Sequence, residues 1–166
     1  NAGSSNSHYL ESHSIAYRSV MGDLPTDGTV VEMVIGYDVK RSGSYALDYL
    51  THYQRLLPHV TFAHRDPEDF DPLDGVSGVS ALVTTAPIPL PTKNLVIDPD
   101  GPESDPAAAQ PMTSMAALPD SERVMTLFGG TLLDVTYVSE GKVDLVTKSS
   151  ETQVKVRFIP NGPVAV

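Results

Sequence analysis

The sequence predicts a mainly β fold: an antiparallel β-sandwich of jelly-roll or Ig-like type, with one short helix and long proline-rich loops. Three observations predict this class. Apolar and polar residues alternate in several segments near both ends of the chain. One internal segment changes to a helical spacing, and no repeat of solenoid length is present. Strands at both ends of a 166-residue chain, with a helix between them, are typical of a single-domain sandwich.

The first strands are expected before residue 40. Residues 14–21 form a short strand candidate, and residues 23–28 form a turn in which Pro and Asp-Gly supply the required backbone angles. Residues 29–39 give the clearest strand, since its apolar side chains fall on one face. That face consists of Val31, Met33, Ile35 and Tyr37.

A helix of two to three turns is expected after Ser42 and Gly43. The spacing of apolar residues changes there from two to three or four, and Pro58 ends the pattern. The residues on this helical stripe are Ala46, Leu47, Leu50, Tyr53 and Leu57.

The remaining chain divides into an irregular middle and a β-rich end. Proline-rich segments such as residues 86–93 favour an edge strand or polyproline conformation, with at most one helical turn near residues 114–118. Leu133, Val135 and Tyr137 are expected to share one face of a late strand, with Leu132 on the other. The other segments expected as strands are 94–98, 123–130, 131–138, 142–148, 152–159 and the final GPVAV, and a hairpin turn is expected at 139–142.

The expected domain organisation has two parts. Residues 1–13 form an extended N-terminal segment, and residues 14–166 form one β-sandwich domain with an irregular insert at about 58–121. The chain begins with Asn1 rather than Met, which fits a mature N-terminus after removal of a signal peptide. We therefore expect an extracellular or cell-surface protein.

The charge of the chain excludes several partners. Its net charge is −10, with 21 acidic and 11 basic residues, so we expect no nucleic-acid binding.

No apolar run is long enough for a membrane span, and the absence of cysteine excludes disulfides and cysteine-based zinc sites.

The segment YDVKRSGSYALDYLTHYQR, residues 37–55, is the most distinctive part of the sequence. With SNSHYLESHSIAYR at 5–18, and the later PIP, FGGT and NGPV, it resembles a poorly characterised domain of secreted bacterial proteins. The resemblance implies export and a β-rich fold but no established activity. The chain departs from that pattern at Glu11-Ser12-His13, in its lack of cysteine, and in lacking a Trp-containing segment after the last strand. The residues that form this structural motif are Tyr37, Gly43, Tyr45, Asp48, Tyr49, Tyr53 and Arg55.

The sequence does not predict an enzyme. No nucleophile, base and orienting group can be assigned together, and the five histidines lack metal-binding spacing. Two acidic loops instead carry hard oxygen ligands beside glycine, which is the ligand type that Ca²⁺ prefers. The candidate calcium ligands are Asp69, Asp71 and Asp74 in one loop, and Asp98, Asp100, Glu103 and Asp105 in the other. The alternative is that these residues only form turns.

Two functional hypotheses follow from the sequence. In the first, the protein is a structural subunit that associates with copies of itself, and its N-terminal segment completes a neighbour's sheet, repeated into a filament. The candidate assembly residues are His8, Tyr9, Leu10, Ile15 and Tyr17. In the second, the tyrosines of the motif stack on a surface glycan in a carbohydrate-binding or adhesive module. Helix packing on a sheet is the other interpretation of those tyrosines.

Overall fold

A computed structural model describes residues 14–42, 44–55, 71–91, 110–140, 147 and 149–166. Strands dominate this part of the chain, and all their pairings are antiparallel. The mainly β fold class with one short α-helix is thereby confirmed for the described residues. The strands are β1 (Val20–Met21), β2 (Val31–Arg41), β3 (Ser44–Tyr45), β4 (Val83–Pro87), β5 (Val124–Ser139) and β6 (Ser150–Ala165); the helices are α2 (Gln110–Ala116) and the 3-10 turn η1 (Asp120–Glu122).

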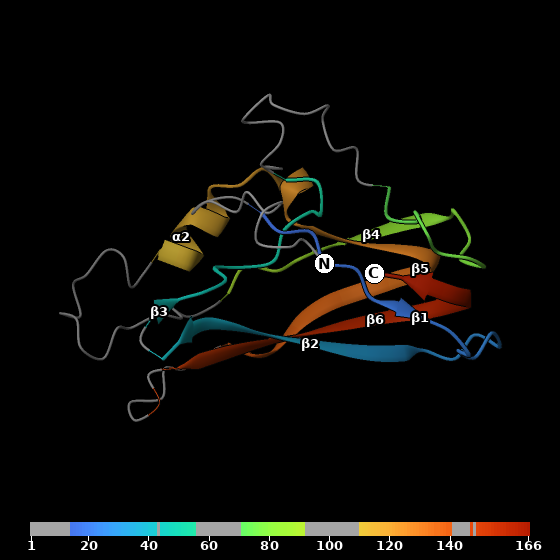
Figure 1. The fold of residues 1–166 in the computed structure, drawn as a ribbon, viewed down its shortest axis with the longest axis horizontal. Helices are drawn as coiled ribbons and strands as arrows, with labels where there is room; N and C mark the ends of the chain where they lie inside the picture. Colours follow the sequence, from blue (N-terminus) through green and yellow to red (C-terminus); the bar gives the residue numbers. More distant parts are fainter. Residues whose placement is uncertain (1–13, 43, 56–70, 92–109, 141–146, 148) are drawn as a thin grey trace.

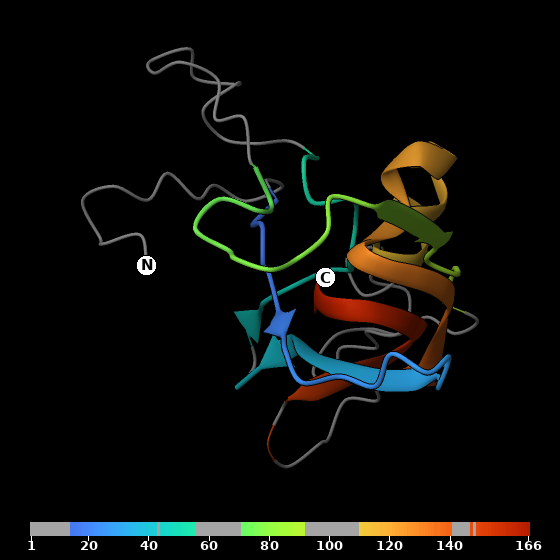
Figure 2. The same cartoon turned by 90° about the vertical axis from the view of Figure 1, so that its right-hand side faces the viewer.

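A single hydrogen-bonded sheet folds over to form the sandwich. Its strand order is β3-β2-β6-β5-β4, and β1 pairs with the end of β6 beyond β2. The long strands β5 and β6 turn back on themselves at one end of the molecule (Figure 1). Viewed end-on, β2 and β4 lie on opposite sides with β5 and β6 curving between them (Figure 2).

A glycine allows the backbones of β5 and β6 to approach each other closely where these two strands turn back. The register of β5 against β6 shifts between Phe128 and Gly130. Gly129 has a φ of 83°, and a Cβ there would lie 2.4 Å from the carbonyl oxygen of Pro163. Only glycine fits both the backbone angle and the contact.

The core lies between the two layers, on the faces that the alternation predicted. In β6, Val154, Val156 and Phe158 are buried, whereas Lys155 and Arg157 lie on the outside. The buried apolar residues of the core are Tyr37, Val39, Ala86, Ile88, Met115, Leu127, Leu132, Val135, Val154, Val156, Phe158 and Val164.

One predicted face of β5 is wrong. Leu133 was expected in line with Val135 and Tyr137, but it is 40 % exposed and Leu132 is buried instead. The register shifts between Leu132 and Asp134, which is a β-bulge. A bulge inserts one residue and moves every earlier side chain to the other face.

The predicted helix after Ser42 is also wrong over its described part. Residues 46–55 contain no helix, and Ser42 lies in the hairpin turn between β2 and β3. The backbone N–H groups of Ala46 and Leu47 donate to the carbonyls of Val39 and Asp38, at 2.9 and 3.0 Å. Because they bond to β2 rather than along the segment itself, the helical spacing has no helical bonds to support it.

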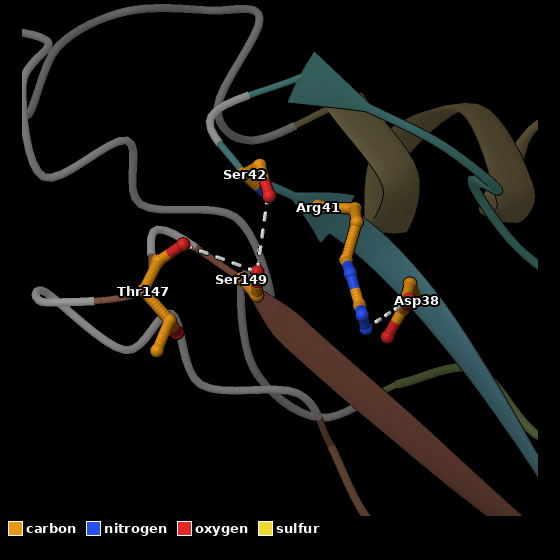
Figure 3. A network of polar contacts seen from close by, with 5 residues as sticks. All are labelled: Asp38, Arg41, Ser42, Thr147 and Ser149. Carbon is orange, nitrogen blue, oxygen red and sulfur yellow. Dashed lines mark hydrogen bonds and ion pairs between the residues drawn. The ribbon is translucent and has the colours of Figure 1, made fainter.

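The hairpin turn has its own polar contacts. Ser42 has a φ of 50°, the left-handed conformation that two-residue hairpin turns need. Its N–H donates to Ser149 Oγ at 3.0 Å, and that hydroxyl donates to the carbonyl of Thr147 at 3.2 Å (Figure 3). Arg41 pairs with Asp38 at 3.1 Å beside the turn.

Other expected elements differ in extent. The strands expected at 123–130 and 131–138 are one strand of 16 residues, and the strand at 152–159 continues through most of GPVAV. Only Val20–Met21 of residues 14–21 is a strand, and α2 lies where a helical turn was expected. The strand predicted at 94–98 and residues 1–13 lie outside the described residues, as does the strand predicted at 142–148 except for Thr147, which lies in a turn. None of the described helices is long and apolar enough to cross a membrane.

Candidate functional site: the open margin of β2

Strand β2 has one paired edge and one edge that is largely open. Its 11 residues pair with β6 along most of their length, from Val31↔Phe158 to Lys40↔Ser150. On the other edge, β3 pairs only with Lys40 and Arg41, and the chain that follows reaches back only to Asp38. Within the described residues, the edge from Val31 to Tyr37 therefore has no neighbouring strand.

The burial of the inner face changes where this edge becomes open. Tyr37 and Val39, next to the returning chain, are 7 % and 0 % exposed. Val31, Met33 and Ile35 lie on the same face of the same strand and are only half-buried. Their partners across the paired edge, on β6, are fully buried, so the burial of this face decreases from β6 toward the edge of β2.

Two tyrosine hydroxyls, Tyr37 on β2 and Tyr137 on β5, lie near each other on the inner side of the sheet. Burial raises the pKa of the Tyr37 hydroxyl above its ordinary value, and the nearby Tyr137 adds to this. Burial likewise raises the pKa of Tyr137 to about 12, and its hydroxyl lies 3.9 Å from Met115 Sδ. Both phenols therefore stay neutral, and the Tyr137 hydroxyl donates to Met115 of α2.

Residues 46–55 are held at the margin by contacts with η1. Arg55 Nε pairs with Glu122 Oε2 at 2.7 Å, and the N–H of His52 donates to the carbonyl of Glu122 at 2.9 Å. Burial lowers the pKa of His52, and the opposing effect of Glu122 is smaller. The N–H of Gln54 donates to His52 Nδ1 at 3.3 Å, which also requires an unprotonated nitrogen.

The chain enters the described structure beside the end of β6. Ser19 and Val166 exchange two backbone hydrogen bonds, of 2.9 and 3.0 Å. Arg18 donates to the carbonyls of Pro72 and Asp74, both at 2.8 Å. Arg18 and Ser19 therefore join this part of the chain to the rest of the described structure. Before them, Tyr17 is 73 % exposed and Ile15 is half-buried.

The described part of the first acidic loop makes internal contacts. Asp71 Oδ1 accepts from the N–H of Leu73 at 2.8 Å, the local bond of a turn-forming aspartate. Two carbonyl oxygens that could face a cation instead accept from Arg18. Among the described residues, no group of His, Asp or Glu side chains has the arrangement of a metal site. The remaining candidate calcium ligands, Asp69, Asp98, Asp100, Glu103 and Asp105, lie outside the described residues, so calcium binding stays a prediction.

The opposite margin of the sheet is protected. Strand β4 has five residues and ends at Pro87, with Pro89 and Pro91 beyond it. Short edge strands and proline both prevent the addition of a further strand. Among the described strands, β2 therefore has the longer and less protected edge.

The predicted site residues are distributed unevenly over this region. Tyr37 belongs to the buried core, Tyr49 packs against that core, and Arg55 pairs with Glu122 of η1. Tyr45 lies in β3, and Gly43, His8, Tyr9 and Leu10 lie outside the described residues. Sequence reasoning did not identify Glu122, because its partner Arg55 is 67 residues away. The half-buried row of β2 could have been found only by knowing that, among the described residues, no strand pairs with the edge from Val31 to Tyr37.

Comparison of the chain with protein-family models, with curated proteins and with solved structures gave no match.

Proposed function

We propose that this protein is an extracellular structural subunit that associates with copies of itself by strand complementation, which repeated head to tail makes a filament. The observation that carries the proposal is the half-buried row of Val31, Met33 and Ile35 beside the open edge of β2. A strand added there would gain main-chain hydrogen bonds and cover apolar surface, which are the two contributions that drive β-strand addition.

The donor in this proposal is the N-terminal segment of a neighbouring copy. Residues 1–13 precede Arg18, whose side chain is hydrogen-bonded to the carbonyls of Pro72 and Asp74, so the donor in this proposal lies on the N-terminal side of that anchor. In an extended segment, Leu10 shares a face with His8 and Ser12, and Tyr9 shares the other with Glu11. Leu10 is the aliphatic residue that would enter the apolar row.

The first test compares the sizes of the particles formed by four chains: the unaltered chain, a shortened chain and two point variants. The unaltered chain should form polymers in size-exclusion chromatography and negative-stain microscopy, and a chain lacking residues 1–12 should stay monomeric. Leu10→Asp should prevent polymers because it places a charge in an apolar row. Ser5→Asp adds the same charge outside that row and should leave the polymers unchanged. Filaments from the shortened chain would refute the donor assignment.

A second test determines which strand of one copy binds the N-terminal donor segment of another. The chain contains no cysteine, so single cysteines can be introduced without background. A chain with Tyr9→Cys is mixed with one carrying Val34→Cys, which lies on the exposed face of β2. Oxidation should give a disulfide between the two chains, found by mass spectrometry, since opposed strand residues lie within disulfide reach. The matched control, Thr85→Cys on β4, should give none, and equal yields from both would contradict the β2 assignment.

A carbohydrate-binding or adhesive module remains the second candidate function. The observation in its favour is Tyr17, an aromatic side chain 73 % exposed. The tyrosines of the motif favour it less, since Tyr49 packs on the core and no helix presents Tyr45, Tyr49 and Tyr53 together. A monomer retained on a glycan column, and released by Tyr17→Ala, would support this function over self-association.

A further inference from the structure

Strand β6 leaves the regular hydrogen-bonding pattern of the sheet near its C-terminal end. Against β5, the register advances from Pro160 to Ala165 on β6 while it moves only from Gly130 to Phe128 on β5. Residues 161–164 therefore lie opposite a single residue of β5. This is a large β-bulge, in which the extra residues of one strand are left out of the ladder.

The other edge of β6 is also unpaired at this bulge. Strand β2 pairs with β6 as far as Phe158, and β1 pairs with it from Val164 onward (Figure 1). Among the described strands, Asn161 and Gly162 therefore have no register partner on either side. Backbone outside a ladder opens more easily than backbone inside one.

Asn161 and Gly162 form a pair with a specific reactivity. The side-chain carbonyl carbon of an asparagine lies close to the backbone nitrogen of the next residue, and a glycine there has no Cβ to hinder their approach. Asn161 is exposed, and a Cβ placed on Gly162 would have nothing within 4 Å. Among the described residues, none holds the Asn161 amide by a hydrogen bond. The side chain therefore has the freedom to turn toward the nitrogen.

We propose that Asn161 is a site of spontaneous deamidation. The backbone nitrogen of Gly162 attacks Cγ of Asn161, the bond between Cγ and the side-chain nitrogen breaks, and ammonia leaves with the proton of the Gly162 N–H. Water then opens the cyclic imide at either of its two carbonyls, which gives aspartate or isoaspartate. Water is the only co-reactant. Both products add one negative charge to the net charge of −10.

Asn161 differs from the other asparagines of the chain in the residue that follows it. The others precede alanine, serine and leucine, whose Cβ hinders the attacking nitrogen, and they are Asn1, Asn6 and Asn94. Asn161 is therefore expected to react first. This modification does not depend on self-association, so it holds or fails separately from the proposed function.

The test measures loss of the amide in the folded full-length chain and in the same chain unfolded in guanidinium chloride. Both are incubated in neutral buffer made with heavy-oxygen water, so that each deamidation incorporates one heavy oxygen atom, and the peptide containing Asn161 is followed by mass spectrometry. Aspartate and isoaspartate forms should separate by chromatography. The two rates should agree within about tenfold, because the bulge already leaves this site outside the ladder. A folded chain that reacts more slowly than this would overturn the proposal, since the sheet would then protect Asn161.

A matched variant assigns the reaction to one residue. Asn161→Gln keeps an amide at the same position but would have to close a larger, less favourable ring, so it should lack the acidic species that ion exchange resolves in the unaltered chain. Its melting temperature checks that it folds. The peptide containing Asn94 is the internal reference and should react at least about tenfold more slowly than that of Asn161. Equal rates at the two asparagines, or the same acidic species from Asn161→Gln, would overturn the assignment.

Discussion

Among single residues, Gly129 has the tightest surroundings of the described glycines that have a positive φ. Its φ of 83° disfavours any side chain, and a Cβ would also collide with the carbonyl of Pro163 at 2.4 Å. Gly28 has a similar φ of 90°, but nothing lies within 4 Å of its Cβ position. The two positions therefore separate backbone strain from steric contact.

We expect Gly28→Ala to lower the free energy of unfolding by about 1 kcal/mol, from the backbone angle alone. Gly129→Ala should cost about 2–4 kcal/mol, because the corner must also open to admit the methyl group. Urea denaturation of both variants measures the difference. Equal losses would mean that the corner of β5 and β6 is not packed as the structure shows.

The lowered pKa of His52 predicts that the stability of the folded protein depends on pH. Burial lowers its folded-state pKa below the ordinary value of 6.5, so near pH 6 the unfolded chain binds more protons than the folded one. The contribution of His52 is complete above the unfolded pKa and is lost as the pH falls through the folded pKa. Stability should therefore fall on acidification from about pH 7 to 5.5.

His52→Asn provides the matched comparison. Its amide oxygen can accept from the N–H of Gln54 without titrating. The carboxylates titrate in both proteins, so the difference between the two melting curves isolates the histidine. Parallel pH profiles would show that His52 is not linked to folding.

At the scale of the element, the bulge in β5 decides which leucine supports the core. Leu132 is 7 % exposed and Leu133 is 40 % exposed. Leu132→Thr should lower the free energy of unfolding by about 2–4 kcal/mol, since it leaves a void and places a hydroxyl in the core. Leu133→Thr should change it by less than about 0.5 kcal/mol. Denaturant unfolding measures the loss of stability in both variants. A larger loss for Leu133→Thr than for Leu132→Thr would contradict the bulge and support the regular alternation that the sequence predicts.

The elements also show which features a local pattern can predict. The alternation in β2 and β6 predicts the correct faces, because a strand with one buried face repeats every two residues. Leu47 and Leu50 have a helical spacing, yet the backbone N–H of Leu47 donates to β2. This segment lies beside β2 because the chain reverses direction at the hairpin that contains Ser42. A bulge, a hairpin and an open edge all depend on which strand lies alongside. The open margin could therefore be located only from the structure, whereas the N-terminal donor is a hypothesis of the sequence.

For the whole molecule, charge sets the conditions under which copies can meet. A net charge of −10 repels approaching copies over roughly one Debye length, about 30 Å at 0.01 M salt and about 3 Å at 1 M. The contacts proposed at the β2 margin are main-chain hydrogen bonds and apolar burial, which salt weakens little.

Polymerisation of the unaltered chain should therefore increase with salt. We expect few polymers at about 0.01 M salt and many at about 0.5 M, because screening removes the repulsion and leaves the short-range contacts. Light scattering during a salt titration measures this, and lowering the pH toward the isoelectric point of 4.7 should act in the same direction. The shortened chain lacking residues 1–12 has nearly the same charge and should not polymerise at any salt. Polymers that dissolve as salt is added would mean that ion pairs between copies, and not an added strand, hold the assembly together.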